Sequence, residues 1–500
     1  SADRRDLAAV VAAVEGDTTG CLATATDHGG YVVATAGGIG GMLAIAYNTA
    51  IVDNDPHFGG EVKLPTGTKE ALTGPQGAEW FTAYNKDLAA KMKNNTFTYV
   101  PRPRGLRVIK TKVTHLFKRE NPVDCTAITE YRARWVGMGF LQTPYQYNAT
   151  YCATPAATSC RLFFCMVLIL GLHTSKGDVT KAFTLCDIDV VLHVEQMPGV
   201  ETNVDSTGRV HENTSDVVCL LHKCLEGLKQ AGNVFQVAHS GFCNGLKLVK
   251  SHGVLIQSEV EPCLFICHCS SGILAILVWV DDIYGAWSTR PIYDEFVELY
   301  AARFPSVHEI GCTKFAGLTI DYKRGQSMTI HQRPHIELAY NKFVTDKVAA
   351  AKSPAVSRPA VSDRASPRHY SKLTLAANDA ERTAMRDKPF LAALATLMYK
   401  VHFTSAHLCY YTSFLGQFMH DPSLMCWYAI LDLIIYDYHN RDIDVIMYGG
   451  EPTIPQAVPE RRRDDFRNSH GLWSTCDASW LIRSPAGYFV FFANGPVDWC

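Results

Sequence analysis

The chain lacks an excess of charge of either sign. Its 500 residues carry 47 Lys and Arg against 49 Asp and Glu, which gives a formal net charge of −2. Because the charges are so nearly balanced, the chain as a whole has no attraction to nucleic acid or anionic lipid. Any such binding must come from local patches. Apolar residues make up 47% and charged residues 19%, which is a globular composition with enough chain for more than one domain.

Signals for secretion and for structural zinc are also missing. No positively charged signal-peptide start is present, and the 17 cysteines are scattered, many of them in apolar runs. This usage is typical of a reduced, intracellular protein with buried thiols. The run CLFICHC at 263–269 lacks the Cys-x2-Cys pair of zinc sites, so a zinc site is not favoured.

Shifts in composition divide the chain into four parts. Residues 1–65 are low in charge and rich in small side chains, and they stay unassigned. Helix and strand patterns follow over 66–345. Residues 346–389 are rich in Ala, Ser, Pro and Arg and resemble a linker, and apolar helical periodicity resumes within 390–500. Within the first part, the uncharged run at 31–52 is long enough to cross a bilayer but only modestly hydrophobic.

One strand pattern has a basic face. Basic and apolar residues alternate in RVIKTKVTHLFK, at 107–118, as in a strand with one side toward solvent. This face is either an edge strand that lysine keeps from aggregating or a track for a phosphate backbone. The candidate nucleic-acid-binding residues on it are Arg107, Lys110 and Lys112.

A buried-strand pattern ends on two adjacent aspartates. In ILVWVDDIYGA, at 276–286, five apolar residues lead into Asp281 and Asp282. Two carboxylates about 5 Å apart repel by roughly 3 kcal/mol at an effective dielectric of ~20, so one should hold its proton unless a cation neutralises the pair. A second pair, Asp464 and Asp465, lies among arginines and is expected in a solvated loop.

The order of the motifs resembles the polymerase segment of Ty1/copia-type retrotransposon polyproteins. Similar fragments follow the family's order, namely KNNTFTYVPRPRGLRVIKTK, YRARWVGMGF, DVTKAF, GLKQA, VDD, FAGLTI, LMYK, FTSAHL, QFMHDP and CDASW. The resemblance covers 66–500 and implies an α+β fold. It implies a right-hand polymerase with fingers, palm and thumb and an antiparallel palm sheet over 66–345. A connection and an incomplete ribonuclease H-like α/β region would follow over 390–500.

The resemblance implies an RNA-directed DNA polymerase that transfers dNTPs onto a primer 3′-hydroxyl with two Mg²⁺ ions, Mn²⁺ being an alternative. The catalytic acids and metal ligands would be Asp178, Asp281 and Asp282, with Asp178 set opposite Asp281 on a neighbouring strand. The partners would be an RNA template, a DNA primer and dNTPs, without stable membrane association. The expected location is intracellular: cytoplasmic, in element particles, with access to the nucleus. The oligomeric state is not indicated.

The same resemblance assigns further residues. Phe183 would lie under the incoming sugar and exclude a 2′-hydroxyl, with a core phenylalanine as the alternative. The positions matching the family's dNTP-binding pocket and fingers are Phe183, Arg132, Arg134, Gly227 and Gln230. Asp477 matches the first carboxylate of the ribonuclease H domain. The other acids of that site would lie beyond Cys500, so no ribonuclease H activity is expected.

Several positions depart from the family pattern. Glu226 replaces a tyrosine and would put negative charge beside a triphosphate, while Met138 replaces the second fingers arginine. Asp437 and Asp442 stand near a lost lysine-arginine pair. An active polymerase therefore competes with a decayed, inactive relic that at most binds nucleic acid. An unrelated membrane-associated protein, resting on the run at 31–52, is the remaining interpretation.

Overall fold

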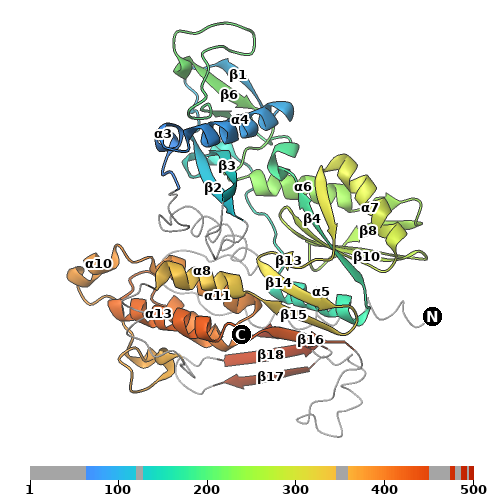
Figure 1. Cartoon of the computed structure of the whole chain (residues 1–500), viewed down its shortest axis with the longest axis vertical. Helices are drawn as coiled ribbons and strands as arrows, with labels where there is room; N and C mark the ends of the chain where they lie inside the picture. The colour runs from blue at the N-terminus through green and yellow to red at the C-terminus, as the bar shows by residue number, and fades with distance from the viewer. Residues whose placement is uncertain are drawn as a thin grey trace.

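In a computed structural model of the chain, residues 64–119, 128–344 and 359–449 are described, together with the backbone of three strands between 473 and 499. The elements stack in three tiers along the long axis of the molecule (Figure 1). The run at 31–52 and the pair Asp464 and Asp465 lie outside the described residues.

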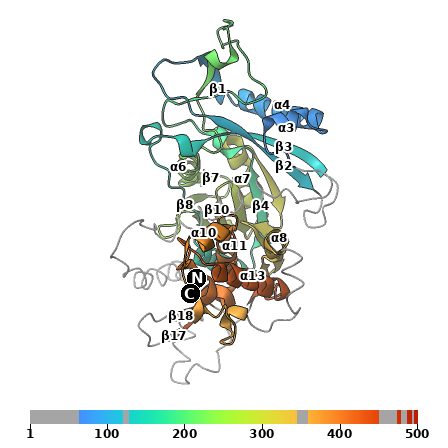
Figure 2. The same cartoon turned by 90° about the vertical axis from the view of Figure 1, so that its left-hand side faces the viewer.

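The upper tier consists of two helices and two small sheets (Figure 2). Its elements are α3 (Thr68–Thr73), α4 (Gly77–Lys93), β1 (Phe97–Pro101), β2 (Thr111–Arg119), β3 (Ile128–Gly137), β5 (His193–Val194) and β6 (Val217–Leu221). Helix α4 packs on β3, where Trp80 contacts Tyr131, and the buried Tyr84 forms a hydrogen bond with His115 of β2. Strand β2 buries Val113 and leaves Lys112 exposed, so the predicted basic face is confirmed as a solvent-facing side.

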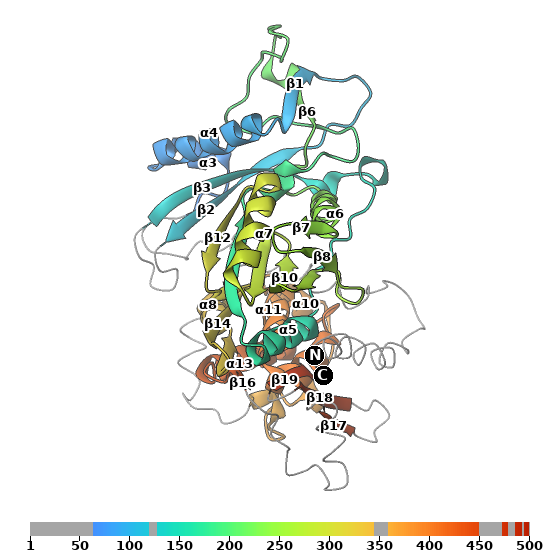
Figure 3. The ribbon, with the colours of Figure 1, turned by 90° about the vertical axis from the view of Figure 1, so that its right-hand side faces the viewer.

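The middle tier is a seven-stranded antiparallel sheet in the order β12-β4-β11-β10-β9-β8-β7. Its strands are β4 (His173–Val179), β7 (Leu246–Leu248), β8 (Gly253–Gln257), β9 (Leu264–Cys269), β10 (Gly272–Trp279), β11 (Asp282–Trp287) and β12 (Ser306–Ile310). Along β10, Ile276 packs with the helices α6 (Ala231–Cys243) and α7 (Arg290–Arg303), whereas Leu277 packs with α5 (Ala157–Ile169) on the other face (Figure 3). Both faces are covered, which explains why β10 reads as an unbroken apolar run.

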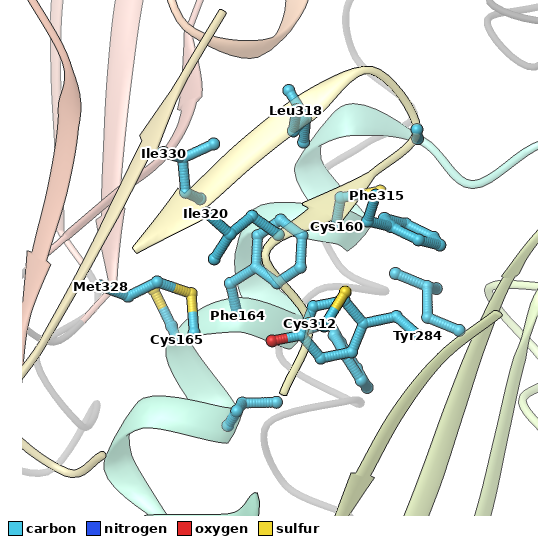
Figure 4. Packing of buried hydrophobic residues seen from close by; sticks show 14 of the residues in the cluster. Cys160, Phe164, Cys165, Tyr284, Cys312, Phe315, Leu318, Ile320, Met328 and Ile330 are labelled. Carbon is cyan, nitrogen blue, oxygen red and sulfur yellow. The ribbon is translucent and has the colours of Figure 1, made fainter. Parts of the chain in front are cut away.

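The lower tier joins α5 to a second antiparallel sheet in the order β13-β14-β15-β16. These strands are β13 (Lys314–Phe315), β14 (Leu318–Lys323), β15 (Ser327–His331) and β16 (Val445–Tyr448). Figure 4 shows their shared core, in which Phe164 of α5 and Tyr284 of β11 lie among Phe315, Ile320 and Met328. This core fixes the middle sheet to the tier below it.

A helical cluster completes the lower tier. It is built from α8 (Arg333–Phe343), α10 (Asp379–Met385), α11 (Phe390–Phe403), α12 (Cys409–Gly416) and α13 (Leu424–His439). Beyond it, the described backbone forms a three-stranded sheet of β17 (Trp473–Ala478), β18 (Ala486–Phe492) and β19 (Gly495–Trp499). The mixed α and β content with antiparallel sheets agrees with the α+β class.

The described part of the predicted linker is packed against the lower helices. Within 359–389, Val361, Leu373 and Met385 are buried in the same cluster as α11 and α13. The composition of this segment is dominated by alanine, serine and proline and therefore resembles a linker. A few apolar side chains are nevertheless enough to pack the segment against the lower helices. The domain boundaries stay predictions. In the ranges that the structure describes, every helix falls short of the length and apolar character that a bilayer span demands.

Protonation of His239 should weaken the fold in acid. Four aromatic rings surround this side chain, which is 2% exposed, and burial lowers its pKa to about 4. The unfolded chain takes up the proton near pH ~6.5, so stability falls by about 1.4 kcal/mol per pH unit as pH drops from ~6.5 to ~4. We expect His239→Gln to reduce the loss of unfolding free energy between about pH 7 and pH 5 in urea titrations. The exposed His268→Gln should leave this loss unchanged, and an equal loss in both variants would contradict the assignment.

Candidate active site

The β10–β11 hairpin presents the two adjacent aspartates at its tip. Trp279 pairs with Asp282, so Val280 and Asp281 form a two-residue turn. Val280 has a φ of 55°, in the left-handed region where β-branched residues are rare. Two-residue hairpins demand positive φ there and usually meet it with glycine or asparagine. The backbone at Val280 is therefore strained directly beside Asp281.

Asp178 lies on the strand next to this hairpin. The register of β4 with β11 sets Asp178 opposite Asp282, and the carbonyl of Asp281 accepts a hydrogen bond from the Val179 N–H at 3.1 Å. The expectation that Asp178 faces Asp281 is wrong by one residue, because the turn takes Asp281 out of the ladder. Directly opposed residues share a face of the sheet. The structure thus brings Asp178, Asp281 and Asp282 to one end of two adjacent strands.

Negative charge at this strand end is incompletely neutralised. Burial and, next, the charge of Asp282 raise the pKa of Asp281 to about 6, with a smaller contribution from Asp178. Residue 281 keeps solvent-exposed surface at the tip of the turn, while the protein packed around its carboxyl group accounts for most of the rise in its pKa. Burial also raises the pKa of Asp282, although Lys176 opposes this shift.

Lys176 is a site residue that the sequence interpretation missed. Its Nζ lies 3.4 Å from Oδ1 of Asp282. Lys176 stands two residues before Asp178 on β4, and residues two apart share a face of a strand. That spacing was the signal that could have identified it.

The donor set at the strand end suits a hard divalent cation. Among the described residues, no group of three or more His, Cys, Asp or Glu side chains is arranged to enclose a metal ion. Mg²⁺ needs less than that, because one or two carboxylates suffice when substrate phosphates and water complete its shell. The raised pKa of Asp281 marks negative charge that such an ion would relieve. Asp178, Asp281 and Asp282 therefore fit the ion chemically and are the residues that would hold it.

The surroundings of Arg132 and Arg134 differ. Arg134 is exposed on β3, and its charge lowers the pKa of Asp281, although by less than burial raises it. Arg132 instead donates to Glu130 at 2.9 Å, and Glu130 also accepts from Lys86. The predicted nucleic-acid-binding residues Arg107, Lys110 and Lys112 are exposed beside and on β2.

The predicted nucleotide residues occupy two loops. Phe183 is half-buried on the short helix η3 (Ala182–Leu185), in edge contact with Phe235 at a centroid distance of 6.3 Å. Gly227 has a φ of 83°, and a Cβ there would lie 2.4 Å from the carbonyl oxygen of Gly137, so only glycine fits. Gln230 is fully buried and accepts from Gln142 at 3.0 Å. Any contribution of Gln230 to a nucleotide pocket is therefore through the loop that it holds.

Glu226 has a partner that its sequence context did not reveal. Its Oε2 lies 3.2 Å from Nζ of Lys91, a fully buried lysine of α4. The charge that was expected beside a triphosphate is thus paired within the protein. Asp477 lies on β17, where its backbone pairs with Gly487.

Comparison with known proteins connects this geometry to a family. Residues 94–356 match the family model described as reverse transcriptase (RNA-dependent DNA polymerase). The chain is 22% identical over 440 residues to the retrovirus-related Pol polyprotein from transposon TNT 1-94 of Nicotiana tabacum, covering 87% of this chain and 30% of the relative. It is 24% identical over 446 residues to the polyprotein from transposon RE2 of Arabidopsis thaliana, covering 86% and 26% respectively. The chain therefore spans less than a third of the length of these relatives.

A solved structure also aligns with most of the chain. It is a foamy viral protease-reverse transcriptase in complex with double-stranded DNA, with a TM-score of 0.39 and 10% identity. The alignment covers 91% of this chain and 59% of the viral one.

Removing the charge of Asp281 should stabilise the metal-free protein at neutral pH. The folded pKa of about 6 lies above the ~3.9 of an unfolded aspartate. Ionisation therefore destabilises the fold increasingly as pH rises from ~4 to ~6. We expect the thermal midpoint of Asp281→Asn to exceed that of the parent at about pH 7.5 in EDTA and to match it near pH 4. Equal midpoints at the higher pH would contradict this assignment.

Proposed function

The chain belongs to the reverse transcriptases of Ty1/copia-type Pol polyproteins, and we propose that it is an RNA-directed DNA polymerase that adds dNTPs to a DNA primer on an RNA template. The observation that carries this proposal is the convergence of Asp178, Asp281 and Asp282 at one strand end. Metal-assisted transfer needs acids gathered in this way, and the raised pKa of Asp281 is typical of a functional site.

Each neighbouring residue then has a distinct task. Bound divalent ions would activate the 3′-hydroxyl and stabilise the departing pyrophosphate, and the three acids would hold these ions. Lys176 orients Asp282 by its ion pair. Arg134, whose charge acts on Asp281, would offer its guanidinium group to the triphosphate. Phe183 limits the space at the sugar.

The tiers fit a right-hand polymerase in this proposal. The upper tier with its β2–β3 hairpin corresponds to fingers, and the seven-stranded sheet corresponds to a palm. We assign 66–345 to the fingers, palm and thumb and 390–500 to a connection with an incomplete ribonuclease H-like region. Asp477 on β17 belongs to the latter.

A decayed relic is the second candidate. The near-equal numbers of acidic and basic residues favour it, since a chain without net positive charge attracts nucleic acid only through local patches. Such a protein would keep template binding and lack nucleotide incorporation.

Primer extension separates the two candidates. With Mg²⁺, poly(A) template, oligo(dT) primer and dTTP, we expect the parent protein to incorporate nucleotide. Asp178→Asn and Asp281→Asn should each lower kcat by about 10²-fold or more, because each removes charge that stabilises the metal-bound transition state. The matched control is Asp321→Asn, which changes an exposed aspartate on β14 and should retain the parent rate. Template binding without incorporation by the parent would favour the relic.

Shortening Phe183 should relax selection of the sugar. Phe183→Val opens space where a 2′-hydroxyl would lie, so we expect the ratio of kcat/KM for dTTP over UTP to fall by about 10-fold or more. Phe183→Tyr keeps the ring and should keep the ratio within about threefold of the parent. An unchanged ratio in the valine variant would identify Phe183 as a packing residue of the α6 contact only.

A further inference from the structure

Four charged side chains meet between helix α4 and two loops of the proposed nucleotide pocket. Within α4, Nζ of Lys91 lies 2.7 Å from Oδ2 of Asp87. The same Nζ lies 3.2 Å from Oε2 of Glu226, which belongs to one of the loops. Oδ1 of Asp87 lies 3.2 Å from Nζ of Lys181. We call Asp87, Lys91, Lys181 and Glu226 the charge cluster. It contains two positive and two negative charges and is therefore neutral as a whole.

The centre of the charge cluster is removed from water. The side chains of Lys91 and Asp87 are 0% and 8% exposed, and that of Glu226 is 16% exposed. Burial opposes the ionised form of Asp87, but Lys91 and the Trp135 N–H, which donates to Oδ2 at 2.9 Å, hold its pKa below the usual range. Loss of one member would leave an uncompensated buried charge, which is strongly unfavourable.

The two loops reach α4 through these charges. Lys181 has a φ of 56° and directly precedes η3, which carries Phe183. Glu226 directly precedes Gly227 at its left-handed turn. At the end of the same helix, Nδ2 of Asn94 donates to Oγ1 of Thr184 at 3.0 Å. One helix thus ties the loop at 179–185 and the loop at 226–230 to a common support.

Helix α4 has an apolar anchor besides the charge cluster. Trp80 and Tyr84 already anchor the helix in the apolar core of the upper tier. Buried ion pairs add little net stability relative to apolar residues, while they fix geometry closely. The charges are therefore better explained by what they hold in place than by the stability they add.

We propose that Asp87, Lys91 and Glu226 are positioning residues that set the separation of the two loops around the incoming deoxynucleotide. The substrate in this inference rests on the proposed polymerase function. The loop geometry can be measured without catalysis, so the positioning role and the polymerase function can be refuted separately.

A charge cycle tests the proposal. Lys91→Met leaves one net negative charge in the cluster, and Glu226→Gln leaves one net positive charge. The double variant keeps the neutral pair of Asp87 and Lys181. We expect each single variant to raise KM for dTTP about tenfold with kcat within about threefold, and the double variant to raise KM no further than the worse single variant, because the tie between Lys91 and Glu226 is lost in all three. Amide hydrogen exchange at 179–185 and 226–230 should accelerate in all three variants.

Controls separate positioning from stability. Lys93→Met removes an exposed lysine from the same helix and should change neither KM nor exchange in the two loops. If Lys91→Met does not fold, Glu226→Gln is compared with Glu226→Asp, which keeps the charge and should recover the parent KM. Lower thermal midpoints with unchanged KM and unchanged loop exchange would overturn the proposal. A double variant whose KM and loop exchange match those of the parent would also overturn it, because the loops would then keep their positions without the Lys91–Glu226 pair. A parent without polymerase activity would refute the proposed function, and hydrogen exchange would still decide the inference.

Discussion

Repulsion among three carboxylates is the constraint around which the middle tier is organised. Asp178 and Asp282 are opposed across β4 and β11, and Asp281 lies at the adjoining turn. Nothing intrinsic to these side chains brings them together, and burial raises the pKa of Asp281 to about 6. The opposing force is the packing of β10 and β11 between apolar clusters on both faces of the sheet. Burial of apolar surface is non-directional, so it can hold the strand ends in register while the acids remain unfavourable.

The turn that carries Asp281 adds a second local penalty. A β-branched residue at a φ of 55° is disfavoured, yet Val280 occupies that position between two well-paired strands. The ladder from Leu274 to Trp279 and from Asp282 to Trp287 over-determines the turn, so the strain persists in the folded chain. Strain and charge repulsion coincide at the same two residues, which is the distribution expected where geometry serves chemistry rather than stability.

Local patterns in the sequence were sufficient for the strands and helices that position the site, but not for their exact register. The apolar run before Asp281 predicted a buried strand, and alternation predicted the exposed basic side of β2. The opposition of Asp178 and Asp282 depends on the two-residue turn at 280–281, and the sequence alone does not show which residues form that turn. Lys176 could have been predicted as a site residue, because it lies two residues before Asp178 on the same strand. The pairing of Lys91 with Glu226, 135 positions apart by their numbers, required the folded chain. Long-range pairs of this kind leave no local pattern.

The folded chain also changes the meaning of the acidic departures. Glu226 is paired with the buried Lys91, and Asp437 is paired with the buried Lys400 at 2.9 Å. Asp442 lies 2.9 Å from Arg333. A buried carboxylate without a partner destabilises a protein by several kcal/mol, so substitutions that introduce one persist only together with a matching cation. Because the charges of Glu226 and Asp437 are neutralised in buried pairs, these two residues add little repulsion toward a nucleic-acid backbone, whereas Asp442 forms its pair at the surface. A near-zero net charge is therefore a poor guide to the field at the site, since charges that cancel in buried pairs count in the total but not at the surface.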